Sequence, residues 1–209
     1  MIAPLARIAL AAVPVLLVVG AILWRVRPSA TPYWARFTFA IPHPLVTRGR
    51  LLRALAPERG ERMLEVGPGL GYYSVPVAQA LGPHGRLDLL DTQQQMLDHT
   101  LRRTARHGLR NVIGTRGDAQ FLAYPAATFD AVYMTLALGE IPDQEAALRE
   151  AERVLRPGGR LVVGELVFDL HWVRLGRLLD QASRAGLAAE KRIGSPIGYF
   201  ARFRSPAGA

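Results

Sequence analysis

The feature that most constrains the fold is a short β-rich run, Arg62 to Val66, that leads directly into the glycine-rich segment Gly67-Pro68-Gly69-Leu70-Gly71. Residues from about Tyr73 to Leu81 follow with helical character, so the sequence predicts a strand, a tight turn and a helix. Glycines permit such a turn and let a ligand approach the backbone beneath the N-terminus of the helix. This pattern is typical of a loop that binds a nucleotide-type cofactor.

The spacing of the glycines disfavours a dinucleotide. The dinucleotide fingerprint is G-x-G-x-x-G, whereas here the third glycine, Gly71, comes one residue early and Tyr72 stands at the position of the last glycine. A nicotinamide-dependent dehydrogenase is therefore a distant alternative.

Strand and helix patterns alternate along the rest of the chain, which predicts an α/β domain with a mostly parallel sheet. The continuous apolar run from Phe129 to Leu138 is typical of a strand that is buried on both faces. Further strands are predicted at Arg86 to Leu90 (closing on Asp91), Val112 to Arg116 and Leu161 to Val167, with helices at Pro44 to Leu55, Gln93 to His107, Asp143 to Leu155 and Trp172 to Ala185. The last two segments, Ala189 to Ile193 and Ile197 to Arg204, are predicted to pair as a hairpin.

The residues from Leu64 to Gly71 resemble motif I of class I S-adenosylmethionine-dependent methyltransferases, in the small-molecule form of the quinone-methylating enzymes (methyltransferase type 11). Other landmarks of that family fall in order: Asp91 after the second strand, Gly117-Asp118-Ala119 after the third, Phe129-Asp130 at the fourth, and Leu155-Arg156-Pro157-Gly158-Gly159 before the fifth. The resemblance covers Glu61 to Leu166, about half of the chain. It implies a Rossmann-like fold with a mostly parallel seven-stranded sheet and S-adenosylmethionine as the cofactor.

The resemblance also implies roles for individual residues. Asp91 would accept hydrogen bonds from both ribose hydroxyls, Asp118 would pair with the adenine amino group beside Ala119, and Glu65 would lie beneath the methionine end. The other cofactor-binding residues implied are Gly67, Pro68, Gly69, Gly71, Thr92, Met96 and Leu136. Plainer interpretations remain open: Asp91 and Asp118 as caps of a helix and a turn, and Glu65 as a solvated strand end.

The sequence does not identify a catalytic residue. Methyl transfer from a sulfonium is an in-line displacement, so a dedicated base is needed only for an acceptor that holds a proton of high pKa. Glu140 is the favoured candidate because it follows the fourth predicted strand, and this strand end lacks the Asn/Asp-Pro-Pro-aromatic motif used on nucleic-acid amines. Other candidates for acceptor contact are His43, Tyr72, Tyr73, Asp143, His171 and Tyr199.

The amino-acid composition excludes several reaction mechanisms and limits the possible binding partners. The chain has no cysteine, which excludes thiol nucleophiles, cluster-bound radical chemistry and Cys-based zinc sites, and no metal site is predicted. Its net charge of +9 suits either lipid headgroups or nucleic acid. Basic residues from Arg102 to Arg110 along one helix favour an RNA methyltransferase as one alternative, against a plain solvated face. A non-catalytic S-adenosylmethionine-binding protein is the other.

The uncharged run from Ile8 to Trp24 is just long enough to cross a membrane as a helix. Arg25 and Arg27 follow it, which predicts a single-pass anchor with the catalytic domain in the cytoplasm; a cleaved signal peptide is the competing interpretation. The predicted division is an anchor at 1–27, a linker and cap helix at 28–56, and the methyltransferase domain at 57–209. A membrane location favours a hydrophobic acceptor: a quinone, a phospholipid amine, a phenol or a thiol.

Overall fold

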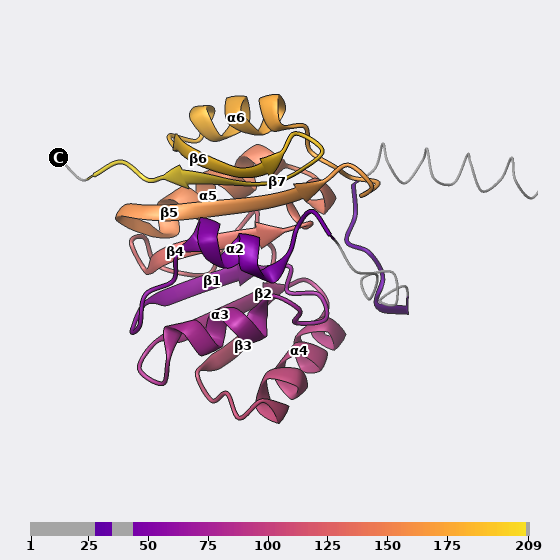
Figure 1. Cartoon of the computed structure of the whole chain (residues 1–209), viewed down its shortest axis with the longest axis vertical. Coiled ribbons are helices and arrows are strands. Elements are labelled where there is room, and N and C mark those ends of the chain that lie inside the picture. Colours follow the sequence, from indigo (N-terminus) through magenta and orange to yellow (C-terminus); the bar gives the residue numbers. More distant parts are fainter. Residues whose placement is uncertain (1–27, 35–43, 208–209) are drawn as a thin grey trace, which may run out of the picture.

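A computed structural model of the chain describes residues 28–34 and 44–207 (Figure 1). Seven strands form one sheet in the order β3-β2-β1-β4-β5-β7-β6. The strands are β1 (Arg62–Val66), β2 (Arg86–Asp91), β3 (Val112–Arg116), β4 (Phe129–Thr135), β5 (Leu155–Leu166), β6 (Ala188–Ser195) and β7 (Gly198–Arg204). The first five are parallel, while β7 pairs antiparallel with both β5 and β6. The strand order reverses between β1 and β4, and ligands bind outside the carboxyl ends of strands at such a point.

Helices cover both faces of the sheet. They are α2 (Arg48–Leu55), α3 (Ser74–Leu81), α4 (Gln94–Arg106), α5 (Gln144–Val154) and α6 (Leu175–Arg184), with a short 3-10 turn, η2 (Leu138–Glu140), after β4. In β1, Met63 joins the apolar cluster beneath α2 and α3, whereas Leu64 and Val66 join the cluster beneath α5 and α6. This alternation, with every one of these side chains buried, is what a strand with two covered faces requires.

The predicted mostly parallel seven-stranded sheet and its terminal hairpin are confirmed, and the differences lie at element ends. The predicted helix at Pro44 begins only at Arg48, because the Thr47 hydroxyl caps it by accepting from the Arg50 backbone N–H. β4 ends at Thr135 rather than Leu138, because Leu136 adopts a left-handed φ of 56° that no strand continues through.

Two boundaries near β5 also differ from the prediction. β5 begins at Leu155 rather than Leu161, because Leu155 already pairs with Phe129 of β4. The last helix begins at Leu175 rather than Trp172, because the Val173 backbone N–H donates to the buried carboxylate of Glu165.

The predicted anchor, Ile8 to Trp24, lies outside the described residues, as does His43. Within residues 28–34 and 44–207, none of the helices combines the length and the apolar character that a membrane crossing needs.

Candidate cofactor site

The three glycines of the loop after β1 all have left-handed backbones, with φ of 69° at Gly67, 53° at Gly69 and 72° at Gly71. A Cβ at Gly67 would stand 2.7 Å from the Cβ of Ala137, and one at Gly71 would stand 2.9 Å from Cγ2 of Thr100. At Gly69 nothing lies within 4 Å of that position. Both packing and backbone conformation therefore require glycine at positions 67 and 71. Gly69 instead presents bare backbone to open space, as a loop that cradles a ligand does.

That open space is a pocket of about 730 Å³ at the carboxyl ends of β1, β2 and β4, within the usual size range of small-molecule sites. Most of the predicted cofactor residues line it: Gly67, Pro68, Gly69, Asp91, Thr92, Met96, Asp118, Ala119 and Leu136, together with Glu140. Two predicted residues do not line it. Gly71 shapes the turn, and Glu65 lies buried within β1.

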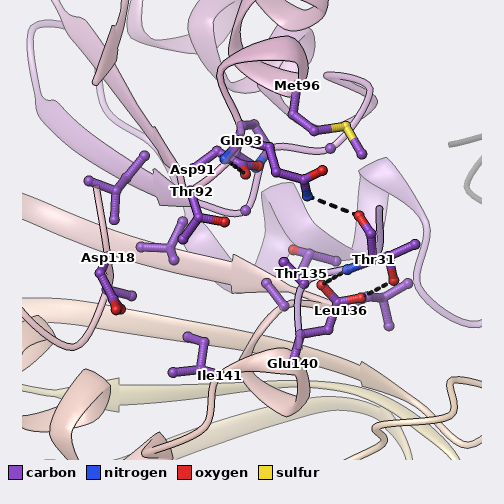
Figure 2. A pocket seen from close by; sticks show the side chains of 18 of the residues that line it. Thr31, Asp91, Thr92, Gln93, Met96, Asp118, Thr135, Leu136, Glu140 and Ile141 are labelled. Atoms are coloured by element: carbon purple, nitrogen blue, oxygen red, sulfur yellow. Dashed lines mark hydrogen bonds between the residues drawn. The ribbon is translucent and has the colours of Figure 1, made fainter. Parts of the chain in front are cut away.

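Asp91 ends β2 with its carboxylate toward the pocket (Figure 2). Its Oδ1 accepts from the backbone N–H of Gln93 at 2.9 Å, but the N-cap of α4 is Gln93, so the plainer interpretation of Asp91 as the cap of that helix is wrong. Burial raises the pKa of Asp91 from 3.8 to about 6, although the Gln93 and Thr92 N–H groups oppose that rise. The carboxylate is thus desolvated and keeps acceptor capacity for a ligand's hydroxyl groups.

Asp118 faces the pocket from the loop after β3. Its Oδ1 accepts from the backbone N–H of Gln120, and the Gln120 side-chain amide donates to both carboxylate oxygens at 2.9–3.0 Å. The Asp118 carboxylate thus accepts from an amide N–H, which is the type of donor that an adenine amino group offers. Ala119 and Met96 also line the pocket, and Met96 is 2% exposed.

Glu65 is 2% exposed, so the interpretation of it as a solvated strand end is wrong. Burial raises its pKa from 4.5 to about 7, while the neighbouring Ser74 and Tyr133 hydroxyls lower it and Asp91 raises it further. Its Oε2 is buried without a hydrogen-bond partner. A buried carboxyl with one oxygen free beneath a glycine loop suits a cationic group bound above it.

The beginning of the predicted linker and cap segment, 28–56, forms another wall of the pocket. Residues 28–31 line it, and Thr31 donates to both oxygens of Glu140, through its backbone N–H at 3.1 Å and through its hydroxyl (Figure 2). Gln93 completes the attachment, because its side-chain amide donates to the Thr31 carbonyl and accepts from the Tyr33 N–H, both at 2.9 Å. We call residues 28–34 the strap. The strap bridges the loops after β2 and β4.

Glu140 therefore has a structural role in this arrangement. Burial raises its pKa, and the two hydrogen bonds from Thr31 lower it. Its proposed part in catalysis stays a prediction. The contacts of the strap could not be predicted from the sequence, because they join residues 60 to 109 positions apart.

The remaining candidates for acceptor contact divide into two groups. Tyr72 and Tyr73 line the pocket, although the Tyr73 hydroxyl donates to the Val46 carbonyl. The other three make structural contacts. Asp143 caps α5, the Tyr199 hydroxyl donates to the Val173 carbonyl, and His171 is buried with its backbone against Gly139. Tyr199 is a core residue, as the plainer interpretation of it predicted.

Comparison with known proteins agrees with this geometry. Residues 63–159 match a family model described as a methyltransferase domain. A ubiquinone/menaquinone biosynthesis C-methyltransferase of Cellvibrio japonicus is 33% identical over 133 residues, which are 63% of this chain and 48% of that protein. Residues 63–159 therefore resemble a methyltransferase domain, and the fold is the Rossmann-like fold of class I S-adenosylmethionine-dependent methyltransferases.

Two further comparisons define how far the similarity extends. A demethylmenaquinone methyltransferase of Staphylococcus aureus (strain JH9) is 33% identical over 117 residues, 56% of this chain and 48% of that protein. The chain thus spans about half the length of these curated relatives. The crystal structure of a SAM-dependent methyltransferase from Aquifex aeolicus superposes with a TM-score of 0.76 at 18% identity, covering 84% of this chain and 100% of that one, which supports the fold alone.

S-adenosylmethionine is the cofactor of this family, and the pocket fits it. Asp91 offers an acceptor for the ribose diol, Asp118 an acceptor for the adenine amino group, and Gly69 an open cradle beside them. The prediction of the cofactor is confirmed by the family, while the individual contacts remain predictions.

Proposed function

We propose that this protein transfers a methyl group from S-adenosylmethionine to a hydrophobic small molecule or lipid. The observation that carries the proposal is the convergence of Gly69, Asp91 and Asp118 on one pocket at the point where the strand order reverses. S-adenosylmethionine supplies a methyl group on a sulfonium that is already activated for displacement. The protein's task is then to fix the donor, exclude water and align the acceptor, which in favourable cases contributes about 7–11 kcal/mol.

The walls of the pocket support a hydrophobic acceptor. Leu70, Met96, Leu136 and Ile141 line it beside the polar residues. The relatives named above are quinone-biosynthesis methyltransferases, which adds support for an acceptor of this class. A quinone, a phospholipid amine, a lipophilic phenol and a thiol all belong to the proposed range.

We further propose that the run from Ile8 to Trp24 anchors the protein as a single-pass helix, with the methyltransferase domain in the cytoplasm. Support comes from its apolar length, from Arg25 and Arg27 after it, and from the strap, which follows it within a few residues and lines the pocket. Carbonate extraction of membranes should leave the full chain in the pellet. Release of the full chain into the supernatant would contradict the anchor.

The transfer itself is tested by incubating the purified full chain with methyl-tritiated S-adenosylmethionine and an extract of bacterial membranes. Label is expected in the organic phase. Asp91→Asn should remove it by weakening cofactor binding. An absence of labelled product in every fraction, although the cofactor binds, would overturn catalysis and favour a non-catalytic binding protein.

A further inference from the structure

One arginine on α4, Arg103, does not lie on the solvent-exposed face of the helix that the neighbouring arginines form. Arg102 and Arg106 are exposed, as the plain interpretation of this basic helix predicts. Arg103 instead lines the pocket, and its Nη1 donates to the Leu70 carbonyl of the glycine loop at 3.0 Å. Burial lowers its pKa, and a second arginine, Arg48, lowers it further.

Arg48 reaches the same place from the first turn of α2. Its guanidinium carbon lies 4.0 Å from the centre of the Tyr72 ring, and both residues line the pocket. Its Nε is buried and has no hydrogen-bond partner. The ring holds the guanidinium by a cation–π contact, which leaves its N–H groups for another partner.

No carboxylate among the described residues balances this pair. Neither Arg48 nor Arg103 forms an ion pair within residues 28–34 and 44–207. The carboxylates that line the pocket are held by other groups: Asp91 by Gln93, Asp118 by Gln120, and Glu140 by Thr31. Two partly buried like charges without a counter-ion are costly, and a bound anion would relieve that cost.

We propose that Arg48 and Arg103, over the Tyr72 ring, form an oxyanion site for a phosphate or carboxylate group carried by the methyl acceptor. Guanidinium groups bind both anions through paired N–H donors. Tyr72 is 37% exposed, so the site lies where the pocket opens to solvent, which is where an acceptor enters. The inference rests on the proposed function, because it names a chemical feature of the acceptor in that pocket.

The test uses the full chain saturated with S-adenosylhomocysteine and two short-chain lipids below their micelle concentrations. Dihexanoyl phosphatidic acid should bind at least about tenfold more tightly than the neutral dihexanoylglycerol, as titration calorimetry would measure. Arg48→Gln should remove that preference, and Arg103→Lys should keep part of it. Arg102→Gln, which removes the same charge from the exposed neighbour on α4, should leave it unchanged.

Competitors distinguish the sources of the anion. Displacement of phosphatidic acid by inorganic phosphate but not by hexanoate supports a phosphate site, and displacement by hexanoate supports a carboxylate site. Equal binding of phosphatidic acid to the wild type and to Arg48→Gln would overturn the inference.

The cofactor's own carboxylate is the rival occupant. If Arg48→Gln weakens S-adenosylhomocysteine but not 5′-methylthioadenosine, which lacks the carboxylate, the pair serves the cofactor and the inference is wrong. Unchanged affinity for both compounds supports it and shows that the variant is folded. Failure of the wild type to bind S-adenosylhomocysteine would instead overturn the proposed function itself.

Discussion

The walls of the pocket have two different origins. The wall at the strand ends, with Gly67 and Asp91, is held by backbone conformation and by the sheet. The opposite wall, the strap, is held by hydrogen bonds to the side chains of Gln93 and Glu140. Backbone that belongs to a sheet opens only with the domain, whereas a segment attached by a few polar contacts opens locally at a small cost in free energy. We therefore expect the cofactor wall to stay fixed with the fold and the strap to open locally.

The largest expected effect tests the fixed wall. Gly67→Ala places a Cβ 2.7 Å from that of Ala137 and forces alanine into a left-handed backbone, so we expect loss of measurable S-adenosylhomocysteine binding and a lower melting temperature. Calorimetry and thermal melting measure both. Gly49→Ala is the matched control, because Gly49 lies within α2 with nothing within 4 Å of its Cβ position. It should stabilise the protein by about 0.5–1 kcal/mol. Similar behaviour of the two variants would contradict the packing argument.

The next effect concerns a single polar contact on the same wall. Asp91→Asn keeps the shape of the side chain but removes the charge that strengthens hydrogen bonds from the ribose hydroxyls, so affinity for S-adenosylhomocysteine should fall about 100-fold. Asp98→Asn, on the first half of α4 and away from the pocket, is the control. A loss of less than threefold (roughly 0.6 kcal/mol) at Asp91 would mean that the ribose lies elsewhere.

Proton binding at Asp91 gives a pH dependence with opposite signs for stability and for affinity. Its pKa is raised from 3.8 to about 6 in the folded protein, so the folded state binds the proton more tightly than the unfolded chain. The Asp91 contribution to stability of the cofactor-free protein therefore grows as pH falls from about 6 towards 4. Cofactor affinity changes the other way, falling about tenfold per pH unit below 6, because the ribose requires the carboxylate form.

Two variants separate the groups that titrate in this range. Asp91→Asn should flatten the fall in affinity, which calorimetry at several pH values would show. Glu65 has a pKa of about 7 and the same direction of shift, so Glu65→Gln identifies its share. A profile that Asp91→Asn leaves unchanged would contradict the assignment.

The smallest expected effect tests the strap. Thr31→Val removes the hydroxyl that donates to Glu140 but keeps the backbone N–H bond, so S-adenosylhomocysteine should dissociate about fivefold faster, with little change in melting temperature. Thr128→Val removes a comparable hydroxyl, which donates to the Pro125 carbonyl on an exposed loop, and should not alter dissociation. Stopped-flow measurements would compare them. Equal rates for all three proteins would show that the strap does not retain the cofactor.

The wall at the strand ends could be predicted from the sequence, whereas the contacts that hold the strap could not. The strand-to-glycine pattern and the acids at strand ends predict the cofactor wall, because local conformation and the 2-residue period of strands determine it. Element ends were less predictable, since the left-handed φ of Leu136 depends on its contact with Gly164 in the next strand. The contacts of the strap and the Arg48–Arg103 pair were not predicted, because each joins segments distant in sequence through side chains that could equally face water.

The attachment of Thr31 limits how far the pocket can lie from the proposed membrane anchor. Six residues lie between Trp24 and Thr31, and the seven steps from one to the other cover at most about 3.6 Å each, or about 25 Å in all. Under the proposed anchoring, the pocket mouth therefore stays within that radius of the bilayer surface. An acceptor dissolved in the membrane would then be found by lateral diffusion in two dimensions, at an effective concentration that dilution of the cytoplasm does not change.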